Sequence, residues 1–403
     1  MEKHWFTLYP DTFLWVKREE GLVYNTLNNL SYFFKITGRV EILCNELSAL
    51  ENLYTSSISE EDMMDQEVQQ WVRSVINIKG GFLTPITENE VNPVSLKPVL
   101  KLQEKTEVLV WEHERGAGGD LLKTIHELTF YINNSDGYGS DRYYRQTTYP
   151  LKKCGQLDME KTLMFIRYCR NPKLTHVNLV GNIFSYPEYN KLLDGLSELC
   201  IPYTIHITLQ DFFQNIKQIN EIQWADYNKF NILIDSLPDR IPPLQDIRAK
   251  IQVNALIFSE SDYRLVSEKF DNIPIYCDVL IIPIYDGKNL DFFESHVFAD
   301  KEELGNIVLT KREIFVRQAL NIHNYGKLTV MSDGTVYANV NHELLGTIDD
   351  TVYSLVYKEF TERRSWLQIR DQAPCTECVY QWLCPSPSNY ETVIGKSNLC
   401  HIF

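Results

Sequence analysis

Four cysteines near the end of the sequence are spaced closely enough to bind a metal together. Cys375 and Cys378 form a Cys-x-x-Cys pair, Cys384 follows after five residues, and Cys400 follows after a further fifteen. The other five of the nine cysteines are scattered along the chain. Four thiolates suit a tetrahedral zinc ion or one iron–sulfur cluster, and the spacing alone does not decide between them. We predict one metal site at these cysteines, and the alternative is four idle thiols.

Composition and charge narrow the classes of protein that fit the chain. Its 403 residues are 44% hydrophobic and 23% charged, an ordinary balance for a globular protein, and the formal net charge is -15. Because an acidic chain repels phosphate backbones, we expect no nucleic-acid partner. The sequence shows no apolar run of membrane-spanning length and no signal peptide, so we expect a cytoplasmic protein with no membrane partner. In a reducing cytosol, clustered cysteines indicate metal binding or catalysis rather than disulfides.

Residues 1–85 predict a small α+β unit. Short runs of aromatic and β-branched residues are interrupted by turn-forming residues, which is typical of strands, and two later segments carry apolar residues at helical spacing. The predicted strands cover residues 5–9, 12–17, 22–24, 30–36 and 82–83, and the predicted helices cover residues 39–50 and 60–78. A three-stranded ribbon followed by helices is the outline of a winged helix-turn-helix.

Residues 126–310 show a different sequence pattern, in which apolar strand-like segments alternate with amphipathic helical segments. The predicted strands cover residues 127–132, 175–180, 203–209, 230–234, 251–258 and 279–284, with helices such as 159–169, 186–200 and 263–270 between them. This alternation predicts βαβ units and a parallel sheet. Six units predict an α/β fold with a partial (β/α)6 TIM-like barrel. The preceding residues 86–125, which contain Pro93 and Pro98, are predicted to be a linker.

Residues 311–403 form the last predicted domain. Strand-like residues on either side of Asp333-Gly334 predict a hairpin over residues 327–338. A helix is predicted over residues 352–362, and the cysteine-rich tail follows it.

The hairpin, Gly346 and the tail resemble the SPASM domain, which follows the catalytic domain of radical S-adenosylmethionine (radical SAM) enzymes that modify peptides. That family has seven cysteines around two auxiliary 4Fe–4S clusters. At two of its cysteine positions this chain has Asn339 and Ser388. A third family cysteine, expected directly after Gly346, is also missing. These losses all fall on ligands of the first cluster in the family. The resemblance therefore implies one remaining 4Fe–4S cluster, with zinc as the alternative, on Cys375, Cys378, Cys384 and Cys400.

The predicted barrel resembles the radical SAM core but lacks the residues for its chemistry. The family carries a CxxxCxxC motif after the first strand, and the matching positions here are Asp136, Ser140 and Tyr143. No cysteine occurs between Cys44 and Cys154. Since a 4Fe–4S cluster needs thiolates, the radical-initiating cluster cannot form there. The family's GGEP turn is also altered, to Gly-Asn-Ile-Phe at residues 181–184, so we expect a pseudo-enzyme that binds no S-adenosylmethionine.

The N-terminal unit resembles the RiPP recognition element, a winged-helix module that captures the leader of ribosomally made peptides. In that family the leader adds a strand beside the third strand, against the last helix. The resemblance implies peptide binding at a strand edge and a helical wall formed by Leu22, Val23, Tyr24, Asn25, Val68, Trp71, Val72 and Val75. The alternative is that the helical residues are simply core. A DNA-binding role is disfavoured, because residues 31–79 carry four positive against eight negative charges.

All three regions together resemble the pseudo-radical-SAM proteins of peptide-maturation systems, the type that accompanies GG-leader precursor peptides in Bacteroidetes. The resemblance implies a non-catalytic partner that binds a precursor leader and pairs with an active radical SAM/SPASM maturase. Two alternatives remain open at this point. One is an iron–sulfur enzyme subunit that transfers electrons or ligates substrate, and the other is a zinc-stabilised scaffold.

Overall fold

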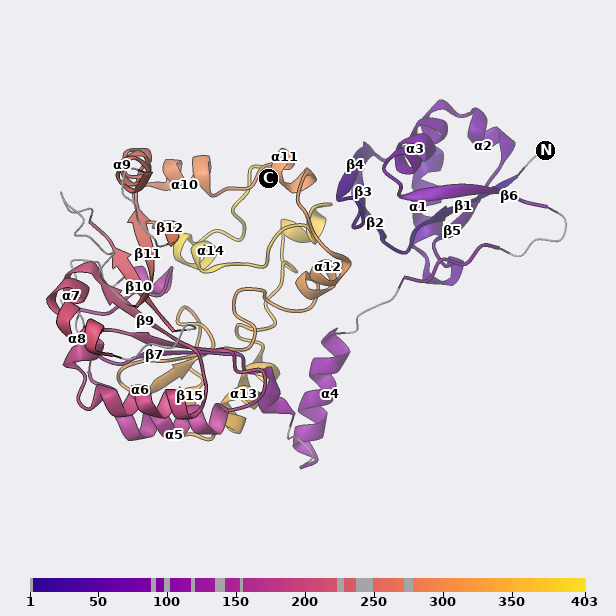
Figure 1. Ribbon diagram of the computed structural model, residues 1–403. Helices are drawn as coiled ribbons and strands as arrows, with labels where there is room; N and C mark the ends of the chain where they lie inside the picture. The colour runs from indigo at the N-terminus through magenta and orange to yellow at the C-terminus, as the bar shows by residue number, and fades with distance from the viewer. Residues whose placement is uncertain are drawn as a thin grey trace.

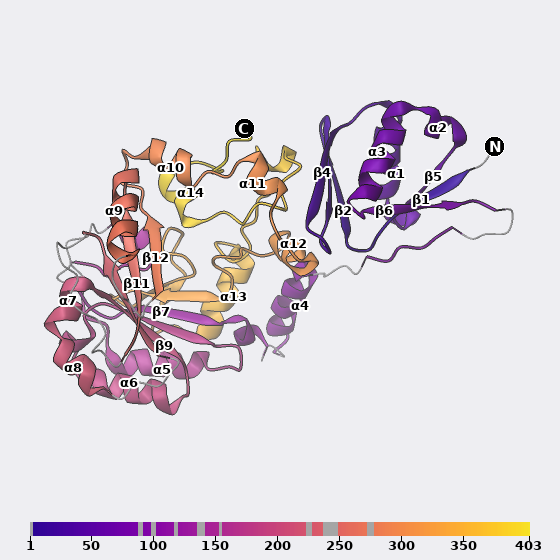
Figure 2. The same ribbon diagram turned by 45° about the horizontal axis from the view of Figure 1, so that its top comes forward.

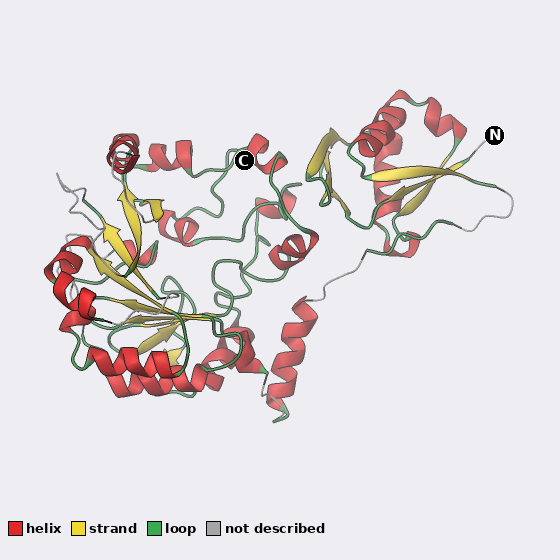
Figure 3. Ribbon diagram, in the orientation of Figure 1, coloured by secondary structure: helices red, strands yellow, loops and turns green. Residues whose placement is uncertain are grey.

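The computed structural model consists of an N-terminal α+β unit, a larger α/β body, and a C-terminal segment that is mostly loop and lies between them (Figures 1 and 3). Among the residues that the structure describes, no helix has the length and apolar character needed to cross a membrane. The structure describes residues 3–87, 92–97, 102–116, 120–134, 142–152, 155–222, 228–236, 249–271 and 278–403.

The N-terminal unit contains two three-stranded sheets, in the orders β5-β1-β6 and β2-β3-β4. All predicted strands and helices of this unit are present, and β5 was not predicted. The long helix predicted over residues 60–78 is divided at Asp65, whose carboxylate accepts hydrogen bonds from the N–H groups of Glu67 and Val68 and so begins a new helix. The elements are β1 (His4–Leu8), β2 (Thr12–Lys17), β3 (Glu20–Asn25), β4 (Leu30–Lys35), α1 (Gly38–Ser48), β5 (Thr55–Ile58), α2 (Glu60–Met64), α3 (Gln66–Asn77) and β6 (Gly81–Pro85).

The sheet β2-β3-β4 is covered on both faces. One face packs on α1 and α3, where the ring of Phe34 meets the ring of Trp71 edge-on at a centroid distance of 5.8 Å. The other face packs on the C-terminal segment, where the Tyr24 hydroxyl donates to Ile307 O and accepts from Leu309 N–H, both at 2.9 Å. We call this second cluster the inter-domain core; its buried residues are Phe13, Leu22, Tyr24, Leu304, Leu309, Ile314, Phe315, Cys378, Val379, Tyr380 and Leu383.

The body is built on a nine-stranded sheet of order β12-β11-β10-β9-β8-β7-β13-β14-β15. Its first six strands are parallel neighbours in chain order, so the predicted α/β fold with six parallel strands is confirmed. These strands are β7 (Glu127–Tyr131), β8 (His176–Val180), β9 (Tyr203–Thr208), β10 (Lys229–Ile234), β11 (Lys250–Ile257) and β12 (Asp278–Pro283).

Helices α5 (Met159–Cys169) and α6 (Tyr189–Glu198) cover one face of this sheet (Figures 1 and 2). Phe130, Leu179 and Ile205 point from the strands into this main core. The two helices approach closely, since a Cβ on Gly195 would lie 2.7 Å from Leu163 Cδ2. Further along the sheet lie α7 (Leu209–Gln214), α8 (Ile216–Glu221) and α9 (Glu260–Asp271).

The predicted hairpin is present and extends the barrel sheet. Strand β13 (Lys327–Val330) pairs in parallel with β7 and antiparallel with β14 (Thr335–Tyr337), and Gly334 in the turn has φ +85°. The short β15 (Gly346–Thr347) follows, and α13 (Val352–Glu362) occupies the predicted helix range. The remaining helices of the C-terminal half are α10 (Leu290–His296), α11 (Lys301–Gly305), α12 (Lys311–Arg317) and α14 (Asn389–Ile394).

The segment predicted as a linker contains a helix, α4 (Leu102–Glu114). Leu109 and Val110 of α4 pack against the main core, and the His113 ring lies 4.9 Å from the Tyr357 ring on α13. The helix was missed because its apolar residues alternate with many charged ones, which weakens the helical pattern. Packing against α13 supplies the stabilisation that the local pattern does not.

Candidate metal centre and peptide-binding edge

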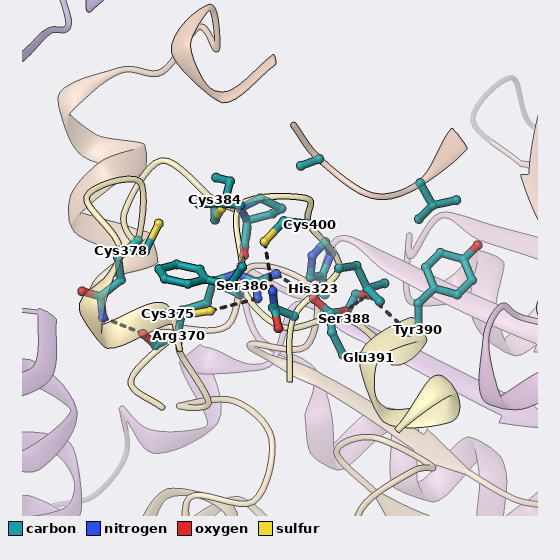
Figure 4. Close-up of a pocket in the computed structure, with 18 residues that line it drawn as sticks. His323, Arg370, Cys375, Cys378, Cys384, Ser386, Ser388, Tyr390, Glu391 and Cys400 are labelled. Atoms are coloured by element: carbon teal, nitrogen blue, oxygen red, sulfur yellow. Dashed lines mark hydrogen bonds and ion pairs between the residues drawn. The ribbon is translucent and has the colours of Figure 1, made fainter. Parts of the chain in front are cut away.

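The four predicted metal-binding cysteines line one cavity of about 240 Å³ (Figure 4). Cys375, Cys378 and Cys384 come from a single loop of consecutive turns, in which the N–H of Cys378 donates to Cys375 O at 3.1 Å. Cys400 reaches the cavity from the end of the chain. It is held there by backbone hydrogen bonds between the residues on either side of it and Ala299.

Two arginines place positive charge beside these thiols. Arg370 is buried, forms an ion pair with the equally buried Glu391 at 2.7 Å, and has its Nη1 3.9 Å from Cys375 Sγ. Arg317 donates to the backbone carbonyl of Leu383, next to Cys384. An ion pair this deeply buried is costly unless both charges are satisfied, and the cavity wall satisfies them.

Burial disfavours ionisation of the thiols. It raises the pKa of Cys378 to about 11 and that of Cys384 to about 12, and the nearby Arg370 partly offsets the effect at Cys384. Because metals bind the thiolate, loading this site must displace protons. The amide of Asn398 donates to Cys400 Sγ at 2.9 Å.

The four thiols line one cavity but are not drawn together around a point. Within the described ranges, no group of three or more Cys, His, Asp or Glu side chains is arranged to hold one metal ion. A zinc ion at about 2.3 Å from each sulfur needs four thiols that converge on it, whereas a 4Fe–4S cluster takes one thiolate at each iron. The cavity lining brings the four cysteines together and leaves the choice between these two metals open.

Asn339 and Ser388, which the SPASM resemblance aligns with ligands of a first cluster, both form hydrogen bonds within the chain. Asn339 is buried and donates to Asn389 Oδ1 at 2.7 Å and to Asn324 Oδ1 at 3.2 Å. Ser388 is the N-cap of α14, where its hydroxyl accepts from Tyr390 N–H and bonds with Glu391. Both side chains therefore have structural partners of their own.

Residues that follow the first two parallel strands, β7 and β8, are closely packed. Of the three expected ligand positions, Asp136 and Ser140 lie outside the described residues. The Tyr143 ring packs against Tyr149 at 5.3 Å and Phe258 at 5.5 Å. Gly181 has φ +131°, and a Cβ there would lie 2.4 Å from Asn133 Oδ1, so the close approach of Asn133 requires glycine at this position.

The predicted peptide-binding residues do not form a strand edge. β3 has hydrogen-bonded neighbours on both sides, so the predicted edge at residues 22–25 is wrong. The prediction counted the three-stranded ribbon from β1, but β1 pairs with β5 and β6. The edge strands of the sheet that contains β3 are β2 and β4, and of these two β4 has the more extensive contact with α3. All eight predicted residues are buried, at 2% exposure or less: Leu22, Val23, Tyr24, Asn25, Val68, Trp71, Val72 and Val75.

The register of β4 shows which backbone groups face its outer side. The N–H of Ile36 donates to Glu19 O at 2.8 Å, so this pair and every second pair along the strand are hydrogen-bonded to β3. Ser31, Phe33 and Lys35 therefore direct their backbone groups away from β3. Among the described residues no strand pairs with this side of β4. The edge next to α3 is thus one strand later than predicted.

Arg370, Arg317 and Asn398 were not predicted as neighbours of the cysteines. Arg370 lies five residues before Cys375, and a basic residue near a cysteine cluster is the one signal that could have found it. Arg317 is far away in sequence and reaches the site through packing of α12 against the cysteine loop.

Comparison with known proteins adds little to this picture. No protein-family model matches the chain, and no curated protein matches it. Among solved structures, the crystal structure of Streptococcus suis SuiB bound to precursor peptide SuiA aligns over 99% of this chain and 98% of its own, at 12% identity and a TM-score of 0.48. A likeness of this degree carries no conclusion about function.

Proposed function

We propose that this chain is a non-catalytic partner in the maturation of a ribosomally synthesised peptide. It captures the precursor leader on the outer side of β4 and pairs with an active radical SAM/SPASM maturase. The observation that carries the proposal is the unpaired side of β4, on a unit whose sheet packs directly against the cysteine loop.

Leader capture at β4 is strand addition. The outward N–H and C=O groups of Ser31, Phe33 and Lys35 give affinity for any extended backbone, and neighbouring side chains give specificity. α3 contacts β4, so we expect it to form the second wall of the leader site. Holding the leader raises the effective concentration of the rest of the peptide at the partner's active site, which requires no chemistry in this chain.

The absence of catalysis rests on the sequence. No cysteine lies between Cys44 and Cys154, so the barrel mouth has no thiolates for a radical-initiating cluster. Production of 5′-deoxyadenosine by this chain alone, with reductant and S-adenosylmethionine, contradicts the proposal and favours the enzyme-subunit alternative.

The metal in this proposal is one 4Fe–4S cluster on Cys375, Cys378, Cys384 and Cys400. It supports the loop on which the N-terminal unit packs, because the same loop contributes Val379 and Tyr380 to the inter-domain core. Metal and sulfide analysis after anaerobic purification separates this reading from the zinc scaffold: iron with sulfide supports the cluster, and zinc contradicts it.

Lys35→Pro tests leader capture, with Lys35→Ala as the matched control. Proline removes one outward N–H without touching the bonds to β3, and edge strands tolerate it. We expect Lys35→Pro to weaken binding of a GG-type leader peptide about tenfold, with little change in Lys35→Ala. Fluorescence anisotropy with labelled leader measures both. Equal affinities in the two variants place the leader elsewhere.

A further inference from the structure

A second cavity, away from the cysteines, concentrates positive charge in an otherwise acidic chain. It measures about 300 Å³ and lies between α4, the turn over Leu121–Thr124, the loop before β8, and α12. Its charged lining residues are four cations and one acid: Lys105, Lys123, Lys173, Arg312 and Asp120. The lining is therefore +3 (four minus one), whereas the whole chain is -15.

Most of this charge is uncompensated. Lys123 pairs with Asp120. Within the described ranges, Lys105, Lys173 and Arg312 have no ion-pair partner, although the chain contains 54 acidic residues. The field of these cations is felt locally, because Lys123 first, and then Lys173 and Lys105, lower the pKa of Asp120. Like charges gathered without partners cost stability, and an anionic ligand relieves that cost.

Part of the cavity lining is apolar, and we call this part the floor. It consists of Leu102 and Leu109 of α4, Val316 and Leu320 from the region of α12, and Tyr325. A phosphate site is usually built from backbone N–H groups and cations that converge on one point. Here the cations come from four separate elements and surround an apolar floor, which matches an apolar side chain flanked by carboxylates.

We propose that this basic cavity binds an acidic peptide segment of a partner protein, with an apolar side chain on the floor and Asp or Glu side chains at the rim. Charge complementarity steers such a segment to this cationic hollow of an acidic chain and raises its association rate. The site is independent of leader capture at β4, so either proposal can fail without the other.

The test uses the full chain and two labelled peptides, Asp-Glu-Leu-Asp-Glu and its uncharged counterpart Asn-Gln-Leu-Asn-Gln. We expect the acidic peptide to bind the wild-type chain, and its affinity to be about tenfold lower for Lys173→Glu. The control is Lys217→Glu on α8, an exposed lysine outside the cavity whose reversal changes the net charge equally. A higher salt concentration should lower the affinity of the wild-type chain for the acidic peptide.

Three outcomes overturn the proposal. They are no binding of the acidic peptide, equal binding of the two peptides, and equal weakening by Lys173→Glu and Lys217→Glu. Inorganic phosphate or pyrophosphate that displaces the peptide at low millimolar concentration reassigns the cavity to a phosphate ligand. Leader binding to the same variants, measured in parallel, reports on β4 alone.

Discussion

The cysteine cavity and the inner face of the barrel sheet satisfy their polar groups in opposite ways. On the barrel face, side chains bond to one another: His206 Nε2 lies 2.9 Å from Asn178 Oδ1, and the Asn231 amide lies 3.2 Å from His206 Nδ1. The Asn178 amide in turn donates to Glu127 at 2.9 Å. In the cysteine cavity the four thiols face a shared hollow, with Arg370 beside them.

This difference shows where capacity for a ligand remains. A polar row whose members are each other's partners gains little from a cofactor, because a ligand would have to replace bonds that already exist. The four thiols instead line one hollow, and a metal bound there would not displace bonds between the thiols. The contrast therefore supports the proposal that the metal site is in the C-terminal segment and not on the hydrogen-bonded face of the parallel sheet.

The strongest test of this contrast is Cys384→Ala, with Cys200→Ala as the control. Cys384 lines the cavity, whereas Cys200 is exposed and lies outside it. We expect Cys384→Ala to lose nearly all bound metal and to unfold the C-terminal segment in a separate, earlier thermal transition. Metal analysis and calorimetry measure both effects. Metal content and melting curves equal to those of Cys200→Ala contradict the metal site.

Arg370→Gln tests the charge that distinguishes the cavity. The substitution leaves Glu391 as an unpaired buried carboxylate, and breaking such a pair costs about 3–5 kcal/mol. Chemical denaturation measures this loss in the metal-free chain. The double variant Arg370→Gln/Glu391→Gln removes both charges and should recover a large part of it. If the double variant is no more stable than Arg370→Gln, the ion pair is not the cause.

Hydrophobic periodicity in the sequence predicted most helices and strands, because the apolar positions of these elements are also the positions that are buried. The six parallel strands and α13 are examples: each has apolar residues on the face that the main core covers. The cysteine site was predictable because three of its residues share one short loop. The edge strand was not predictable, since its identification depends on the partners of β1, and these lie 48 or more residues away. The role of Arg370 depends likewise on Glu391 and on packing, which no local pattern encodes.

His206→Gln tests whether the hydrogen-bonded residues on the inner face of the parallel sheet stay uncharged as the pH falls. Burial lowers the pKa of His206 to about 3, so the folded protein keeps it neutral where the unfolded chain, with a pKa near 6.5, binds a proton. The free energy of unfolding should therefore fall by about 1.4 kcal/mol per pH unit as pH drops below 6. Glutamine can replace both hydrogen bonds and does not titrate. The stability difference between wild type and His206→Gln should shift towards the variant between pH 6 and pH 5.

Denaturation at several pH values measures this shift, with the exposed His296→Gln as the control. The other buried histidines are present in every variant, so their contributions cancel in the comparison. A stability difference that is constant with pH means that His206 is protonated in the folded protein. In that case the hydrogen-bonded side chains around His206 can accommodate a charge, and the sheet face differs less from the cysteine cavity.

The smallest effect is expected at Phe33, which links two further regions, the N-terminal unit and the cysteine loop. Its ring is stacked on Tyr380 of the cysteine loop, with 6.3 Å between centroids and an interplanar angle of 4°. Phe33→Ala should remove about 1 kcal/mol of aromatic contact and loosen the loop, while Phe33→Tyr should preserve it. Because the loop carries three of the four cysteines, loss of metal to a chelator should be a few-fold faster in Phe33→Ala. An unchanged rate means that the cysteine cavity holds its metal without the N-terminal unit, and that the two regions are neighbours without being coupled.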